Sequence, residues 1–236
     1  MKQTKKLALF DIDGTLITTR GKGVSHWQQS ITASFARVFR PLPEFDGRKL
    51  NGKLERQYFR ELADLIGVTE QEFDAKFPDV IAEFNRHFIR AIDTKQFEVL
   101  RIPEAYDTVL RLKKSPHVEI GLLTGNNEAL AWHKMKAADF ADTFSFGVFG
   151  TEKSHRGELV KHAAAKAAIH FNCEFSASDI IVIGDTKHDI EAAKYAGAFA
   201  LGVTTGLTDT REDLERAGAD LIVDMLTESA VLTVLP

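Results

Sequence analysis

The chain has 236 residues, of which 44% are hydrophobic and 27% charged, and its formal net charge is -4. This composition is typical of a globular protein with a substantial core, and it gives no electrostatic case for binding nucleic acid or an anionic membrane. The apolar run that follows the first lysines is too short for a signal peptide, and no run approaches the length of a membrane span. The single cysteine, Cys173, excludes an intrachain disulfide. We therefore expect a cytoplasmic protein with neither nucleic acid nor membrane as a partner, and its oligomeric state stays open.

Two acidic residues follow the first apolar segment of the chain. Residues 7–10 are apolar and predict a short buried strand, and Asp11 and Asp13 come directly after it. Side chains two positions apart in an extended segment lie on the same side, and Gly14 lets the backbone turn away. Two neighbouring carboxylates repel each other unless a cation or hydrogen-bond donors compensate. The pair therefore indicates a metal site or acid–base chemistry.

Residues 18–100 have the pattern of a helical insert. Apolar residues recur at helical spacing over about 27–39, 54–66 and 73–92. Many of the 17 phenylalanines lie in this insert. Their spacing predicts the packed core of a helical module, with an apolar substrate pocket as the alternative interpretation.

Short strands alternate with helices in the rest of the chain. The pattern predicts helices over about 104–114, 127–138, 157–170 and 189–196, with strands over 119–124, 144–149, 180–184 and 199–203. Such alternation is typical of a parallel sheet built from β-α-β units. We expect the first strand to join this sheet, which gives an α/β fold interrupted by the helical insert.

Two later strands also end in polar residues. Thr124, Gly125 and Asn126 follow one of them, and a helix start at this point offers backbone N–H groups to a phosphate, although Thr124 alone could be a helix cap. Asp185 follows another strand, and Asp189 falls in the first turn of the next helix. Ligands of open parallel sheets bind at the carboxyl ends of the strands, and clustered carboxylates there favour Mg²⁺.

A site with this much negative charge needs a fixed cation to hold a phosphorylated ligand. Lys153, Arg156 and Lys161 surround the start of the predicted 157–170 helix, and each could instead be a solvated surface charge.

These motifs resemble those of the haloacid dehalogenase (HAD) superfamily, specifically its phosphatases with a helical cap, of the phosphoglycolate phosphatase type. Asp11-Ile12-Asp13-Gly14-Thr15, Thr124-Gly125-Asn126 and the segment from Gly184 to Asp189 match three motifs in order. The resemblance implies a Rossmann-like core formed by residues 1–17 and 101–236, with a cap formed by residues 18–100. The third motif departs from the family pattern because no Lys-Pro pair is present, and we favour Arg156 over Lys153 and Lys161 for its role.

The resemblance also implies roles for the individual residues. Asp11 is expected to be the nucleophile and Asp13 the acid and base, with Thr124, Gly125, Asn126 and Arg156 binding the phosphoryl group. Mg²⁺ is expected at Asp11, the backbone carbonyl of Asp13 and Asp185, with Asp189 as a further ligand or as an anchor.

The expected reaction is therefore Mg²⁺-dependent hydrolysis of a small phosphorylated metabolite through an aspartyl-phosphate. A phosphosugar mutase and a non-catalytic phosphometabolite-binding module are the alternatives. Specificity is expected to lie in the cap, where Lys53 and Arg56 are candidates for contact with an anionic leaving group.

Overall fold

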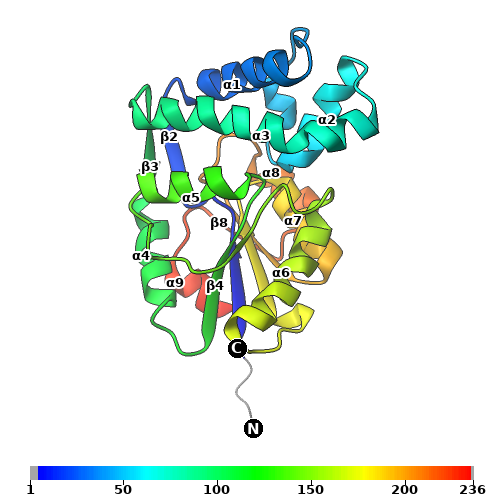
Figure 1. The fold of residues 1–236 in the computed structure, drawn as a ribbon. Coiled ribbons are helices and arrows are strands. Elements are labelled where there is room, and N and C mark those ends of the chain that lie inside the picture. The colour runs from blue at the N-terminus through cyan, green and yellow to red at the C-terminus, as the bar shows by residue number, and fades with distance from the viewer. Residues whose placement is uncertain (1–4, 235–236) are drawn as a thin grey trace.

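A computed structural model describes residues 5–234 and has a six-stranded parallel sheet with helices on both faces and a helical unit above one end (Figure 1). The strands in spatial order are β5 (Gly147–Val148), β4 (Val118–Leu123), β1 (Lys6–Phe10), β6 (Ile180–Gly184), β7 (Phe199–Val203) and β8 (Leu221–Val223). One face is covered by α4 (Pro103–Leu112), α5 (Glu128–Ala137) and α9 (Glu228–Thr233). The other face is covered by α6 (Arg156–Phe171), α7 (Lys187–Ala196) and α8 (Arg211–Ala217). The predicted α/β fold with a parallel sheet is confirmed.

Residues 7–10 of the central strand β1 are buried, and their side chains alternate between the two cores. Ala8 and Phe10 pack into the core that includes α4 and α5, whereas Leu7 and Leu9 pack into the core that includes α6 and α7. This two-sided burial explains why β1 is a continuous apolar run. It also fixes the position of β1 in the sheet, so that Asp11 lies directly after the carboxyl end of this strand.

The helical unit lies between β1 and α4 in the chain and sits above the sheet (Figure 1). It contains α1 (Gly23–Val38), a 3₁₀ turn (Gly47–Leu50), α2 (Glu55–Leu65) and α3 (Glu70–Asp93). The prediction that residues 18–100 are helical throughout is wrong at both ends, because β2 (Ile17–Gly21) and β3 (Phe97–Arg101) form an antiparallel ribbon. In β3, the buried Phe97 and Val99 alternate with the exposed Glu98, as expected for a strand. This alternation covers too few residues to be recognised next to long helices.

The remaining predicted elements lie within a few residues of those in the structure. The strands over 180–184 and 199–203 coincide with β6 and β7, whereas the strand predicted over 144–149 is reduced to the two residues of β5. The elements α8, β8 and α9 follow the last predicted strand and complete the sheet edge.

The neighbouring strands β4, β1 and β6 end at the same level of the sheet. Phe10 of β1 pairs with Leu122 of β4 and with Ile183 of β6. The residues that follow these strands therefore meet at one sheet edge, below the helical unit. No helix within residues 5–234 combines the length and apolar character needed to cross a bilayer.

Candidate active site

Three carboxylates meet at the edge of the sheet. Asp11 follows β1, Asp185 follows β6, and Asp189 lies in the first turn of α7. One carboxylate oxygen of each lies within 4.8 Å of the others, and all three residues are buried. Asp189 is held in place by the capping box of α7, because its Oδ2 accepts hydrogen bonds from the N–H and the hydroxyl of Thr186 at 3.1 and 2.7 Å.

Arg156, at the start of α6, binds two of these carboxylates. Its Nη2 donates to Asp11 Oδ1 at 2.8 Å and to Asp189 Oδ1 at 2.5 Å. The residue is 8% exposed, so these are charge-assisted hydrogen bonds in a largely desolvated site. Among the buried side-chain nitrogen and oxygen atoms of residues 5–234, its Nε alone has no hydrogen-bond partner. The guanidinium therefore retains a free donor beside the acid cluster, which suits an anionic ligand.

The cluster carries more negative than positive charge. Burial, followed by repulsion from Asp189, raises the pKa of Asp11 to about 7, although Arg156 opposes this shift. Burial and the charges of Asp11 and Asp189 raise the pKa of Asp185. Burial alone would lower the pKa of Arg156, but Asp189 and Asp11 raise it. The three carboxylates outnumber the single guanidinium, and their oxygens are suitable ligands for a divalent cation.

Two glycines line the carboxylate of Asp185. A Cβ atom at Gly14 or at Gly206 would collide with the oxygens of Asp185. Gly14 also has φ of +87°, a backbone conformation that favours glycine. Both loops can therefore approach Asp185 closely because they lack side chains at these positions. The hydroxyl of Thr15 donates a hydrogen bond to Asp185 Oδ1 at 3.1 Å.

Asp13 lies apart from the cluster with its side chain turned toward β4. Asn126 Nδ2 donates to Asp13 Oδ2 at 2.8 Å and to Thr124 Oγ1 at 2.8 Å. Lys134 Nζ donates to both oxygens of Asp13, at 2.9 and 2.7 Å, and to Asn126 Oδ1 at 2.9 Å. Thr124 and Asn126 thus lie beside Asp13, and Asp13 is held by a different set of partners from Asp11.

Lys134 is a site residue that the sequence analysis missed. It lies in α5 and its side chain is 7% exposed. A signal was present in the sequence, because Lys134 follows Leu130 and Ala131 by four and three residues and so falls on their buried face of the helix. A lysine on the apolar face of a short helix is unusual and indicates an acidic partner.

The other predicted basic residues are placed differently. Lys161 pairs with Glu158 at 3.2 Å on the surface. Lys53 lines the cavity described below, but its Nζ pairs with Glu61 at 2.6 Å.

Arg56 is directed away from the acid cluster. It pairs with Asp74 at 2.6 Å, and its guanidinium lies 4.9 Å from the centre of the Phe77 ring. Both partners belong to α3. We therefore omit Arg56 from the proposed substrate contacts.

The start of α2 in the helical unit is bonded to the loops of the core. Glu55 N donates to Gly125 O at 2.9 Å, and Arg56 N donates to Gly150 O at 3.2 Å. Arg156 Nη1 also donates to Gly52 O at 2.8 Å. The residue that binds the acid cluster therefore also binds the helical unit, so the position of this unit and the arrangement of the cluster are linked.

A buried carboxyl group strengthens this junction. Glu55 is 2% exposed, and its Oε2 accepts from Asn127 Nδ2 at 2.7 Å. Asn127, the N-cap of α5, also exchanges two hydrogen bonds with Asn85 of α3. Burial raises the pKa of Glu55 to about 7, with Asn127 and Lys134 opposing the shift.

We expect Glu55→Gln to stabilise the protein above neutral pH. The pKa of Glu55 is higher in the folded protein than its usual value of 4.5, so the folded state binds more protons between about pH 4.5 and 7 and wild-type stability falls as the pH rises through that range. Glutamine removes this loss, and the gain at pH 8 is expected to reach about 2–3 kcal/mol. Urea unfolding at pH 5 and pH 8 measures it. If Glu55→Gln and the wild type differed by the same free energy of unfolding at pH 5 and at pH 8, the assigned ionisation of Glu55 would be contradicted.

A cavity of about 270 Å³ lies between the helical unit and the sheet edge. It is lined by Asp11, Asp13, Thr124, Arg156 and Asp185 from the core. Its walls on the other side come from α1, α2, α3 and the turn before α2. The acid cluster therefore opens into a small chamber of the size that binds small molecules.

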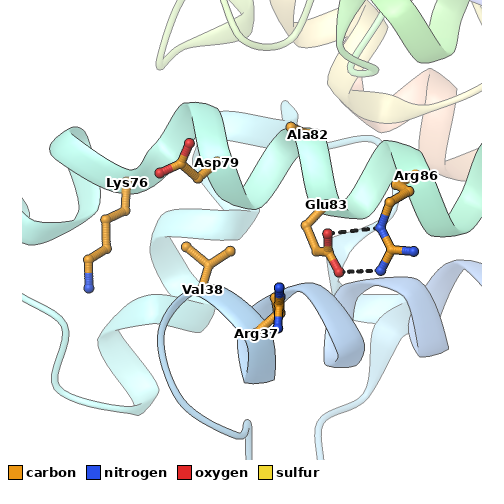
Figure 2. A pocket seen from close by; sticks show the side chains of 7 residues that line it. All are labelled: Arg37, Val38, Lys76, Asp79, Ala82, Glu83 and Arg86. Carbon is orange, nitrogen blue, oxygen red and sulfur yellow. Dashed lines mark hydrogen bonds and ion pairs between the residues drawn. The ribbon is translucent and has the colours of Figure 1, made fainter.

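A second, open groove lies on the outer surface of the helical unit. Figure 2 shows its side chains on α1 and α3, including Arg37, Lys76 and the paired Glu83 and Arg86. Charges of both signs alternate along it, and it shares no residue with the acid cluster. Its composition is that of an ordinary solvated helix surface.

Comparisons with known proteins agree with this geometry. A family model described as a haloacid dehalogenase-like hydrolase matches residues 5–197. The chain is 33% identical over 126 residues to a phosphoglycolate phosphatase of Neisseria gonorrhoeae, and this match spans half of each chain. It is 26% identical over 223 residues to a Clostridium perfringens protein named as a pyrophosphatase, PpaX, covering 93% of this chain and 92% of that one. Among solved structures, β-phosphoglucomutase from Clostridium difficile superposes with a TM-score of 0.70 at 18% identity, covering 98% and 97% of the two chains, which shows the shared fold.

Proposed function

Because the chain belongs to the haloacid dehalogenase-like hydrolases, we propose that it is a Mg²⁺-dependent phosphatase that hydrolyses a small phosphate monoester. The observation that carries this proposal is the buried cluster of Asp11, Asp185 and Asp189 with Arg156, which lines the chamber between the helical unit and the sheet edge. The names of the relatives, a phosphoglycolate phosphatase and a pyrophosphatase, support hydrolysis of a phosphorylated small molecule.

Asp11 is proposed to attack the phosphorus atom. A new bond forms between its carboxylate oxygen and phosphorus while the bond to the leaving oxygen breaks, which gives an aspartyl-phosphate. Asp13 donates a proton to the leaving oxygen and then accepts a proton from the water that attacks the phosphoenzyme. Phosphate is released and the carboxylate of Asp11 is restored. Thr124, the Gly125 and Asn126 amides and Arg156 are proposed to hold the phosphoryl oxygens.

Mg²⁺ would be held by Asp11, the backbone carbonyl of Asp13, and Asp185. When bound, the ion supplies positive charge that neutralises the phosphoryl oxygens as the phosphorus is attacked. Asp189 already uses both oxygens, toward Thr186 and Arg156, so we assign it to the anchoring of Arg156. The cap is proposed to comprise residues 18–100, and it excludes water from the reacting atoms.

Lys134 is proposed to position Asp13. The ammonium group contacts both oxygens of Asp13 and also Asn126, so it fixes the carboxylate beside the phosphate-binding loop. The side chain of Asp13 is 43% exposed, and Lys134 is the partner that anchors it to the buried face of α5.

Lys134→Met is expected to lower kcat by about 10–100-fold while KM changes little, because proton transfer depends on the position of Asp13. Stability is expected to change little, since Asp13 can be solvated when its partner is removed. Steady-state kinetics and thermal unfolding check both results, and Lys136→Met on the same helix is the matched control. A raised KM with unchanged kcat would instead mean that Lys134 binds substrate.

Phosphate release from p-nitrophenyl phosphate tests the proposed function. We expect release with Mg²⁺, loss of release with a chelator, and recovery when Mg²⁺ is returned. A substrate panel covering sugar phosphates, nucleotides and phospho-acids that gave no Mg²⁺-dependent release would overturn the proposal. Ligand binding without turnover would then favour the binding-module alternative, and isomerisation of a hexose 1-phosphate without free phosphate would favour the mutase.

A further inference from the structure

The upper wall of the cavity is aromatic. Trp27, Tyr58 and Phe88 come from α1, α2 and α3 and all line the chamber. The rings of Trp27 and Tyr58 meet edge to face, with centroids 5.6 Å apart. Each cap helix therefore contributes one large ring to the space above the acid cluster, whereas phenylalanines such as Phe59 and Phe84 fill the core of the cap itself. Most phenylalanines of the insert therefore form its packed core, whereas Phe88 lines the cavity.

Apolar side chains also form the rim of the chamber. Val24 at the start of α1 is 67% exposed, and Leu207 in the loop after β7 is 98% exposed. Asn51 of the cap donates to Thr208 Oγ1 at 3.3 Å across this rim. These two exposed aliphatic side chains, one in the helical unit and one in the core, both line the cavity and offer contact area to an apolar group.

The positive charges of the chamber already have acidic partners. Lys53 pairs with Glu61, Lys134 with Asp13, and Arg156 with Asp11 and Asp189. Within residues 5–234, the lining therefore provides no cation that lacks an acidic partner. Glu55 adds a further carboxyl group to the lining.

An anionic leaving group would consequently meet unfavourable surroundings. A carboxylate or a second phosphate placed in the upper chamber would lose its hydration against aromatic walls and gain no free cation in exchange. A neutral, partly apolar alcohol would instead bury its surface against these walls. The volume of about 270 Å³ limits the group to a small one.

We propose that the substrates of this enzyme are phosphate monoesters of small, neutral, partly apolar alcohols. This inference rests on the proposed phosphatase function and deepens it. It distinguishes this chain from the relatives by their names, since the alcohol released from phosphoglycolate carries a carboxylate and the group released from pyrophosphate is itself a phosphate.

A matched pair of esters tests the proposal. Isobutyl phosphate has the shape of 2-phosphoglycolate with two methyl groups in place of the carboxylate oxygens, and both are esters of primary alcohols. Benzyl phosphate adds an aromatic ring of a size that suits the chamber. With Mg²⁺, we expect kcat/KM for isobutyl and benzyl phosphate to exceed that for 2-phosphoglycolate and for pyrophosphate by about tenfold or more.

Two variants probe the walls. Phe88→Ala is expected to lower kcat/KM for benzyl phosphate about tenfold and to affect 2-phosphoglycolate less. Leu65→Ala, which removes an exposed side chain from the cap surface, is the matched control and is expected to leave both unchanged. Glu55→Gln is expected to raise the relative kcat/KM for 2-phosphoglycolate.

The outcomes separate this inference from the proposed function. Hydrolysis of 2-phosphoglycolate or pyrophosphate as fast as that of the neutral esters would overturn the inference and leave the phosphatase assignment intact. Absence of Mg²⁺-dependent release from every ester would overturn the assignment instead. In that case, calorimetric binding to the Asp11→Asn variant still ranks the ligands, and tighter binding of 2-phosphoglycolate than of benzyl phosphate would overturn the inference independently of turnover.

Discussion

Replacing Asp11 with asparagine is expected to lower kcat by about 10⁴-fold or more, because the amide can neither attack phosphorus nor hold a phosphoryl group as an acyl phosphate. The fold is expected to survive, since Asn keeps the size of the side chain and removes repulsion within the acid cluster. Steady-state phosphate release with Mg²⁺ measures the loss, and Asp79→Asn on the exposed cap surface is the matched control. Turnover within tenfold of the wild type would contradict the assignment of the nucleophile.

Asp11→Asn is also expected to change how the stability of the protein depends on pH. Asp11 has a folded-state pKa of about 7 against a usual value of 3.8, so in the absence of metal the folded state binds more protons between about pH 4 and 7. Wild-type stability is therefore expected to fall as the pH rises through this window. In Asp11→Asn that fall is expected to be smaller, and urea unfolding in a chelating buffer across the window measures the difference.

Replacing Arg156 with methionine is expected to have the largest effect on stability. The substitution leaves Asp11 and Asp189 buried without their cation, which costs about 3–5 kcal/mol in the metal-free protein. It also removes the hydrogen bond to Gly52 O, which joins the cap to the cluster. We expect kcat to fall by about 10²–10³-fold where the variant is folded, because a donor to the transferring group is lost.

Arg156→Lys separates charge from geometry. Lysine keeps the positive charge but lacks the planar fork that reaches two carboxylates and a carbonyl together. We expect stability to recover in large part while activity stays well below that of the wild type. Arg86→Met, on the exposed side of α3, is the matched control (Figure 2). Full activity of Arg156→Met, or equal losses in Arg156→Met and Arg86→Met, would contradict the role of Arg156.

The sequence predicted the core of the fold because its strands are buried on both faces. The continuous apolar runs before Asp11 and Asp185 are consistent with few structures other than buried strands, and β6 and β7 were placed correctly, whereas β8 was not predicted. The β2–β3 ribbon was missed because its strands are five residues long and flanked by long helices, so the helical pattern dominated every window that contained them. Its pairing joins residues 17 and 101, a contact that no local pattern reveals.

The site was predictable where the chemistry follows directly after a strand. Asp11, Thr124 and Asp185 are such residues, and the register of the sheet brings them to one edge. Lys134 and Glu55 could not be found in this way, because each acts through a contact between elements far apart in sequence. Asp13 and Lys134 are separated by 121 residues, and Glu55 and Asn127 by 72. Their importance depends on burial in the assembled junction of cap and core.

The covalent intermediate tests the account most directly. Wild-type and Asp13→Asn enzymes would be mixed with Mg²⁺ and a phosphate ester carrying a radioactive phosphoryl group, quenched in acid, and digested for mass spectrometry. We predict a phosphoryl group on Asp11 that forms and decays more slowly in Asp13→Asn, and no label in Asp11→Asn. A label on another residue, or phosphate release by Asp11→Asn at the wild-type rate, would contradict the account.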